Sequence, residues 1–265
     1  MRTPDKKVIS DSLEFAARWG FLTQSLFFEF FCRMSRAQQY RYWSYLTDKG
    51  YFVKSKHHEH TLILSYRSRK LLGDQVRPAR SYFYIEHDSI VARFYLSLAQ
   101  RDLLGDTWLE DELMRNPLEA YSVLGCQQIQ RVPDLVFDLK RNNAAAIRCA
   151  LEIEKSTKSK SRYAKIALAY LDMSKVSISL YGCVSETTAK VIRSAFNSPE
   201  FVERDRIPGT FFYESYDASQ FNSQVRFADN EMTFQNFISV VTGHSLRGRI
   251  EKSISVCKPQ KSEAA

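Results

Sequence analysis

The sequence lacks several patterns that define common classes of protein. Its five cysteines are widely scattered and form no CxxC pair, which argues against a zinc ribbon or a disulfide framework and favours a reducing, cytoplasmic compartment. Its nine glycines are dispersed, and the absence of a GxxxxGK[ST] loop argues against ATP-driven chemistry. No apolar run reaches about 18 residues, so no membrane span is expected. The basic N-terminus leads into an amphipathic segment and does not match a secretory signal.

Positive charge is present, and it is unevenly distributed. The 265 residues carry a net charge of +8. The first 80 residues contain 15 Lys and Arg against 7 Asp and Glu, whereas the remaining 185 contain 23 of each. A concentrated excess of positive charge predicts a surface for a polyanion, and double-stranded DNA is the expected partner. A chance asymmetry is the alternative.

The first third of the chain has the pattern of a small helical module. Apolar spacing predicts two helical stretches in residues 8–33, separated at Gly20, and a third helix from Ser35 to Gly50 with Trp43 pointing inward. Two short strands, YFVKSK and TLILSY, then flank the turn HHEH, which we interpret as a solvated tip rather than a metal chelate. Three helices and a hairpin are the plan of a winged helix-turn-helix, in which the third helix enters the major groove.

The polar residues of this module are the predicted DNA contacts. They are Arg36, Gln38, Gln39, Arg41 and Tyr42 on the third helix, Lys54 and Lys56 on the hairpin, and Arg67, Arg69 and Lys70 after it. Side chains of these types reach base edges or neutralise phosphates. A surface for protein–protein contact is the alternative.

Two strands in the middle of the chain carry acidic residues. After a helix expected from about residue 87 to 101 and a second over residues 106–116, the strands DLVFDL and IRCALEIEK are predicted around a polar turn. Residues i and i+2 of a strand share a face, so Glu152 and Glu154 point the same way, and Asp134 opens the neighbouring strand beside Glu152. Such carboxylates repel each other unless a cation or protons neutralise them, and a hard divalent ion is one resolution. A polar strand face in solvent, with Lys155 and Lys158 as counterions, is the other.

These residues carry a family resemblance. Pro133-Asp134, a hairpin and then Glu152-x-Glu154-Lys155 resemble the core of PD-(D/E)xK nucleases. The continuation EIEKSTKSKSRYAKIALAYL is similar to the replication-relaxation proteins, including MobC-type mobilisation relaxases, which carry a winged helix before such a domain. The resemblance covers most of residues 10–185. Glu154 occupies the place of the family's lysine.

The resemblance implies a catalytic centre and its ligands. Mg²⁺ or Mn²⁺ would be held by Asp134 and Glu152, with Glu154 as a third ligand or a base and Glu110 or Glu112 as a further carboxylate. Lys155 or Lys165 would face the phosphate, and Lys158 and Arg162 would contact DNA. Tyr170 is interpreted as a core residue rather than a covalent nucleophile, because its spacing from Tyr163 and Ala167 is helical.

The last third predicts a strand over residues 175–184, a helix capped by Ser185, edge strands GTFFYESY and SQVRFAD, and a closing helix EMTFQNFISVV. The expected fold is therefore α/β (α+β): a winged helix over residues 1–80, then a PD-(D/E)xK-like mixed sheet flanked by helices over residues 81–245, and a polar tail over residues 246–265.

The expected function is metal-dependent DNA nicking in plasmid or mobile-element mobilisation, with other mobilisation or replication proteins as further possible partners. Two alternatives remain open. One is a catalytically inactive, sequence-specific DNA-binding regulator of plasmid replication or transcription. The other is a restriction- or transposon-type endonuclease that cuts both strands. Nothing in the sequence predicts an oligomeric state.

Overall fold

The computed structural model describes residues 5–73, 76–79, 81–197, 208–213, 223–227 and 230–243. The chain divides within one long helix into two compact units, residues 1–97 and 98–265, whereas the sequence-based boundary at residue 80 precedes that helix. The predicted tail over residues 246–265 lies outside the described residues. Within the described ranges, no helix is both long and apolar enough to cross a membrane.

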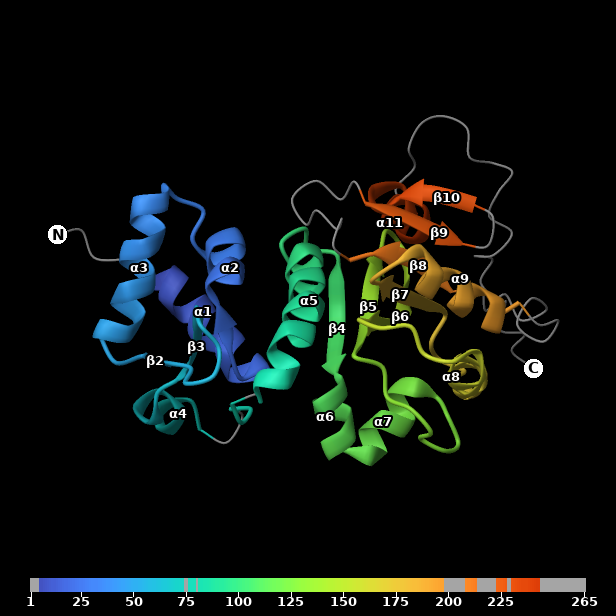
Figure 1. Cartoon of the computed structure of the whole chain (residues 1–265), viewed down its shortest axis with the longest axis horizontal. Helices are drawn as coiled ribbons and strands as arrows, with labels where there is room; N and C mark the ends of the chain where they lie inside the picture. The colour runs from blue at the N-terminus through green and yellow to red at the C-terminus, as the bar shows by residue number, and fades with distance from the viewer. Residues whose placement is uncertain are drawn as a thin grey trace. The chain divides into compact units, whose positions relative to one another are not determined.

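The first unit combines helices with a small antiparallel sheet (Figure 1). Its elements are α1 (Lys6–Trp19), β1 (Leu22–Thr23), α2 (Gln24–Leu26) continued by the π-helical turn η1 (Phe27–Phe31), α3 (Arg36–Asp48), β2 (Phe52–Lys54), β3 (Thr61–Leu64), α4 (Tyr66–Leu72) and most of α5 (Tyr82–Ala99). The sheet order is β1-β3-β2, and β3 is antiparallel to both neighbours. The predicted helices and hairpin are present, although α5 begins at Tyr82 rather than near residue 87.

An aromatic core stabilises the first unit. Phe15 and Trp19 lie one turn apart on α1, are buried, and stack with 5.6 Å between their ring centroids. Trp43 of α3 points inward as predicted, with its ring centroid 5.4 Å from that of Phe27. Burial of each such side chain contributes about 1.5–3 kcal/mol to folding. Gly20 ends α1 at φ 80°, a left-handed conformation that glycine adopts without steric cost.

The second unit is built on a seven-stranded mixed sheet. Its elements are β4 (Leu104–Leu109), α6 (Glu110–Arg115), α7 (Pro117–Leu124), β5 (Leu135–Arg141), β6 (Ala144–Glu154), α8 (Lys160–Asp172), β7 (Ile178–Cys183), α9 (Glu186–Ala195), β8 (Gly209–Phe212), β9 (Gln224–Phe227), β10 (Asn230–Thr233) and α11 (Phe234–Thr242). The sheet order is β10-β9-β8-β7-β6-β5-β4. Strands β6, β7 and β8 are parallel, and the other neighbouring pairs are antiparallel.

Helices lie on both faces of this sheet (Figure 1). On one face, residues of α6, α7, α8 and α9 share a hydrophobic core with Val136, Ala150 and Tyr181 of the strands. On the other face α11 contacts β5, and Phe211 of β8 packs against Phe234 with ring centroids 5.7 Å apart. The expected α/β class, a mixed sheet flanked by helices, is therefore confirmed.

Several element predictions for this unit are wrong in detail. The helix expected over residues 106–116 is the end of β4 followed by α6, because Trp108 pairs with Val136 in the sheet and the acidic residues begin a helix at Glu110. The strands expected at a sheet edge, β8 and β9, are internal, because β10 extends the described sheet beyond β9. The closing helix begins only at Phe234, since residues 230–233 form β10 and the Thr233 side chain caps α11.

Candidate functional site

The acidic residues of β6 lie under helices rather than in solvent. Glu152 and Glu154 share one face of the strand, as predicted, but each is only 1% exposed. This is the face that carries the core contacts of α8 and α9. The opposite face, with Leu151 and Ile153, is also buried. The alternative of a solvated polar strand face is therefore wrong, and each carboxylate needs a buried partner.

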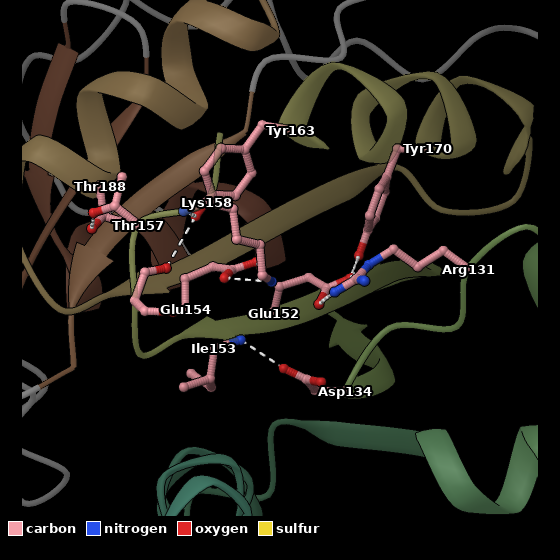
Figure 2. A network of polar contacts seen from close by, with 11 residues as sticks. Arg131, Asp134, Glu152, Ile153, Glu154, Thr157, Lys158, Tyr163, Tyr170 and Thr188 are labelled. Atoms are coloured by element: carbon pink, nitrogen blue, oxygen red, sulfur yellow. Dashed lines mark hydrogen bonds and ion pairs between the residues drawn. The ribbon is translucent and has the colours of Figure 1, made fainter. Parts of the chain in front are cut away.

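Glu152 has two such partners from different parts of the chain. Arg131, in the segment before β5, donates from Nε to Oε1 at 2.6 Å and from Nη2 to Oε2. Tyr170 of α8 donates its phenolic hydroxyl to Oε1 at 2.9 Å. Figure 2 shows both side chains converging on the Glu152 carboxylate. A two-pronged guanidinium–carboxylate contact is among the strongest side-chain interactions, and here it is largely removed from water.

Burial makes the Glu152 carboxylate easier to protonate than an exposed one. Burial and the nearby negative charge of Asp134 raise the pKa of Glu152 to about 7, although Arg131 and Tyr170 oppose the shift. Tyr181 of β7 lies beside Glu152 in the parallel register, is fully buried, and its hydroxyl has no hydrogen-bond partner among the described residues. Burial, and then the charge of Glu152, raise the pKa of Tyr181 well above its usual value.

The raised pKa gives a prediction for stability against pH. Because the folded state holds a proton on Glu152 up to about pH 7 while the unfolded state releases it near 4.5, folding binds a proton in that interval. The free energy of unfolding contributed by this group should therefore fall by up to about 3 kcal/mol as the pH rises from 4.5 to 7, and stay level above it. Urea titrations of wild type and Glu152→Gln across this range measure the difference. Parallel stability curves would contradict the assignment.

Glu154 is neutralised by a nearby lysine. Lys158 places its ammonium 2.6 Å from the Glu154 carboxylate, and the same ammonium lies 6.0 Å from the ring centroid of Tyr163. Lys158 is half-buried, so its position suits an internal counterion better than the DNA contact expected from the sequence. The part of the alternative hypothesis that made Lys158 a counterion is confirmed. The other three predicted cations of this region are exposed: Lys155, Arg162 and Lys165.

Asp134 links the start of β5, the end of β6 and the start of α6. It directly precedes β5, and its Oδ2 accepts a hydrogen bond of 2.7 Å from the backbone amide of Ile153 (Figure 2). Its carbonyl oxygen accepts from the amide of Glu110 at the start of α6, at 3.3 Å. Glu112 of the same helix accepts from the amide of Leu109 at 2.8 Å and so caps α6. These contacts fix the chain around the strand ends.

The described side chains do not fit the expected divalent ion. Mg²⁺ and Mn²⁺ require several oxygen ligands at once. Both oxygens of Glu152 accept hydrogen bonds from Arg131, and Glu154 is paired with Lys158. No group of three or more His, Cys, Asp or Glu within the described ranges is arranged to hold a metal. In this arrangement the acids form a neutralised internal network, and no hydrolytic step follows from it.

Sequence reasoning missed Arg131 and the hydroxyl of Tyr181. Tyr170 is a buried core residue, as predicted, but its contact with Glu152 was not foreseen. The available signal was the arginine three residues before Asp134, because each acid on a buried strand demands a cation close by. The aromatic rings of Tyr170, Tyr181 and Phe196 complete the enclosure, with centroids 5.8 to 6.5 Å apart.

Most of the predicted DNA contacts of the first unit lie on its surface. Arg36, Gln38, Arg41, Lys54, Lys56, Arg67 and Lys70 are exposed, and Tyr42 and Arg69 are half-buried. Gln39, which is also among the predicted contacts, is half-buried: its amide nitrogen donates to the carbonyl oxygens of Phe28 and Cys32, at 3.2 and 2.8 Å, and so joins α3 to the preceding helical turn. The HHEH segment forms the turn between β2 and β3, with His57 and His60 exposed as expected for a tip.

Comparison of the chain with family models, with curated proteins and with solved structures finds no match. The resemblance to replication-relaxation proteins therefore depends on the motifs of this sequence alone.

Proposed function

We propose that the protein binds double-stranded DNA through its first unit, which acts as a winged helix, and that its sheet unit is a nuclease-like scaffold without hydrolytic activity. The order of helices and strands from α1 to β3, with the sheet order β1-β3-β2, supports the winged-helix interpretation. In that plan α3 lies in the major groove and the β2–β3 turn approaches the phosphate backbone.

One observation carries the DNA-binding proposal. The seven exposed polar side chains from Arg36 to Lys70 come from α3, from β2 and its turn, and from α4, all within one unit of fewer than 100 residues. All but Gln38 are cationic, and the 80-residue segment that contains them carries the whole net charge of +8. Such cations bind DNA by displacing condensed counterions from the phosphates. The resemblance points to a plasmid site, in mobilisation or replication control, as the target.

The second unit supports a scaffold rather than a hydrolase. Strands β4 to β8 are consecutive in the sheet, only β5 is reversed among them, and α8 connects β6 to β7, which is compatible with the nuclease-like core that the resemblance implies. The acids that would serve such a core are bonded to Arg131, Tyr170 and Lys158 instead. We infer that this network stabilises the sheet and leaves bound DNA intact.

Metal-dependent cleavage is the second candidate, favoured by one observation. Asp134 directly precedes Leu135, the partner of Leu151 in the sheet, and its negative charge is the second cause, after burial, of the raised pKa of Glu152. Cleavage would require Arg131 to leave Glu152 so that both carboxylates turn to a shared ion. Supercoiled plasmid incubated with the protein and Mg²⁺ or Mn²⁺ tests this directly. We expect it to stay supercoiled; a relaxed product that Glu152→Gln abolishes would establish nicking, and a linear product would establish double-strand cleavage.

Binding itself is tested by fluorescence anisotropy with labelled duplexes over a range of salt concentrations. If four of the exposed cations neutralise phosphates, a fourfold rise in salt should lower the affinity about 100-fold. An affinity that is insensitive to salt, or no binding at low salt, would contradict the proposal.

A further inference from the structure

A groove of about 820 Å³ lies within the first unit. It is lined by residues from the start of α2, the first turns of α3, the turn between β2 and β3, and α5. Of the exposed predicted DNA contacts on α3, Arg36 lines the groove, whereas Gln38 and Arg41 do not. The groove therefore flanks the face of α3 that is proposed to read a duplex. Its volume is in the range of sites that hold small organic ligands, about 300–1,000 Å³.

Two aromatic rings and one guanidinium are in contact within the groove lining. The ring of Tyr40 is 43% exposed and meets that of Phe28 edge-to-face, with centroids 5.1 Å apart. The guanidinium of Arg36 lies 5.9 Å from the centroid of the Tyr40 ring. An exposed aromatic face beside an arginine suits a flat, conjugated ring, which stacks on the aromatic face and on the guanidinium plane.

The groove lining also includes hydrogen-bond acceptors. Glu59 from the hairpin turn and Glu86 from α5 both line the groove and are exposed. A carboxylate accepts hydrogen bonds from the exocyclic amino group of a base. Gln39 also lines the groove, and its two hydrogen bonds to backbone carbonyls hold α3 in place against the preceding helical turn. The groove lining thus contains an exposed aromatic side chain, hydrogen-bond acceptors and a cation.

We propose that this groove binds a nucleobase, stacked on Tyr40, with Arg36 placed for the attached phosphate. The base has two possible sources, a free nucleotide or an unpaired base in a DNA strand. A base inside a duplex is excluded, because its faces are already stacked on its neighbours. The unpaired base deepens the proposed function: it would let the first unit bind a junction between duplex and single strand, with α3 on the paired side.

The experiment compares three probes by anisotropy or competition. They are a blunt duplex, the same duplex with a single-stranded extension, and the free mononucleotides dAMP, dCMP and dTMP. For the extended duplex we expect tighter binding than for the blunt one, and Tyr40→Ala should remove about tenfold of that affinity. Tyr40→Phe, which keeps the ring, should retain it. Tyr66→Ala is the matched control, because Tyr66 is 84% exposed on α4 and does not line the groove.

The possible outcomes distinguish base binding in the groove from the proposed binding of duplex DNA by the first unit. Loss of extended-duplex affinity in Tyr40→Ala, with blunt-duplex affinity unchanged, supports an unpaired base. If mononucleotides bind in a way that depends on Tyr40, and the single-stranded extension does not change the affinity for the duplex, the groove binds free nucleotides. If the protein does not bind the blunt duplex but still binds the extended duplex or a mononucleotide through Tyr40, the proposed duplex binding is wrong and the proposed base-binding groove is supported. Equal affinity of wild type and Tyr40→Ala for every probe overturns the groove proposal.

Discussion

Replacing Arg131 with alanine is expected to lower the free energy of unfolding by about 3–5 kcal/mol at pH 8. The substitution leaves the Glu152 carboxylate buried with the Tyr170 hydroxyl as its remaining hydrogen-bond donor among the described side chains, and an uncompensated buried charge is far more costly than an exposed one. At pH 5 the loss should be smaller, because Glu152, with a pKa of about 7, is then protonated and needs no cation. Urea titration at the two pH values, with hydrogen exchange of the β6 amides, measures both effects.

Two further variants make this result specific to the buried pair. Lys140→Ala is the matched control, because Lys140 pairs with Asp102 at the surface, where the side chains are 49% and 91% exposed, and should cost less than about 1 kcal/mol. Replacing both members, Arg131→Met with Glu152→Met, should recover most of the loss, since apolar side chains of similar volume carry no desolvation cost. Equal losses in Arg131→Ala and Lys140→Ala would show that the Glu152 contact does not stabilise the sheet.

The first unit was more predictable from its sequence than the second. Gly20 and Gly50 both adopt positive φ, at 80° and 71°, next to helix ends, and Ser35 directly precedes α3. Such residues mark element ends through backbone geometry alone, so the helices and the hairpin could be located. By contrast, β10 is four residues long and leads straight into α11. The alternation of apolar and polar residues in it is therefore too short to distinguish a strand from the start of the helix.

The candidate site was predictable only in part, for a physical reason. Strand periodicity correctly put Glu152 and Glu154 on one face. Periodicity does not reveal what covers that face, and an acid at every second residue is also the pattern of a half-exposed strand. The helices α8 and α9 bury this face, and the cation that burial requires comes from an irregular segment without any repeat. A metal was therefore the natural inference from sequence, whereas in the described structure the chain supplies its own cations.

The double variant Arg41→Ala with Lys54→Ala is expected to weaken duplex binding about 10- to 100-fold at low salt and to reduce the slope of log affinity against log salt by about 2, one for each lost phosphate contact. Both side chains are exposed, on α3 and β2, so the fold should be unchanged, which circular dichroism can verify. Lys140→Ala removes an exposed cation from the second unit and should leave the slope unaltered. If Arg41 instead contacts a base edge, its single variant will lose discrimination between DNA sequences rather than salt dependence. Unchanged affinity and slope in the double variant would mean that α3 and the hairpin do not face DNA, which would overturn the winged-helix proposal while leaving the Arg131–Glu152 network untouched.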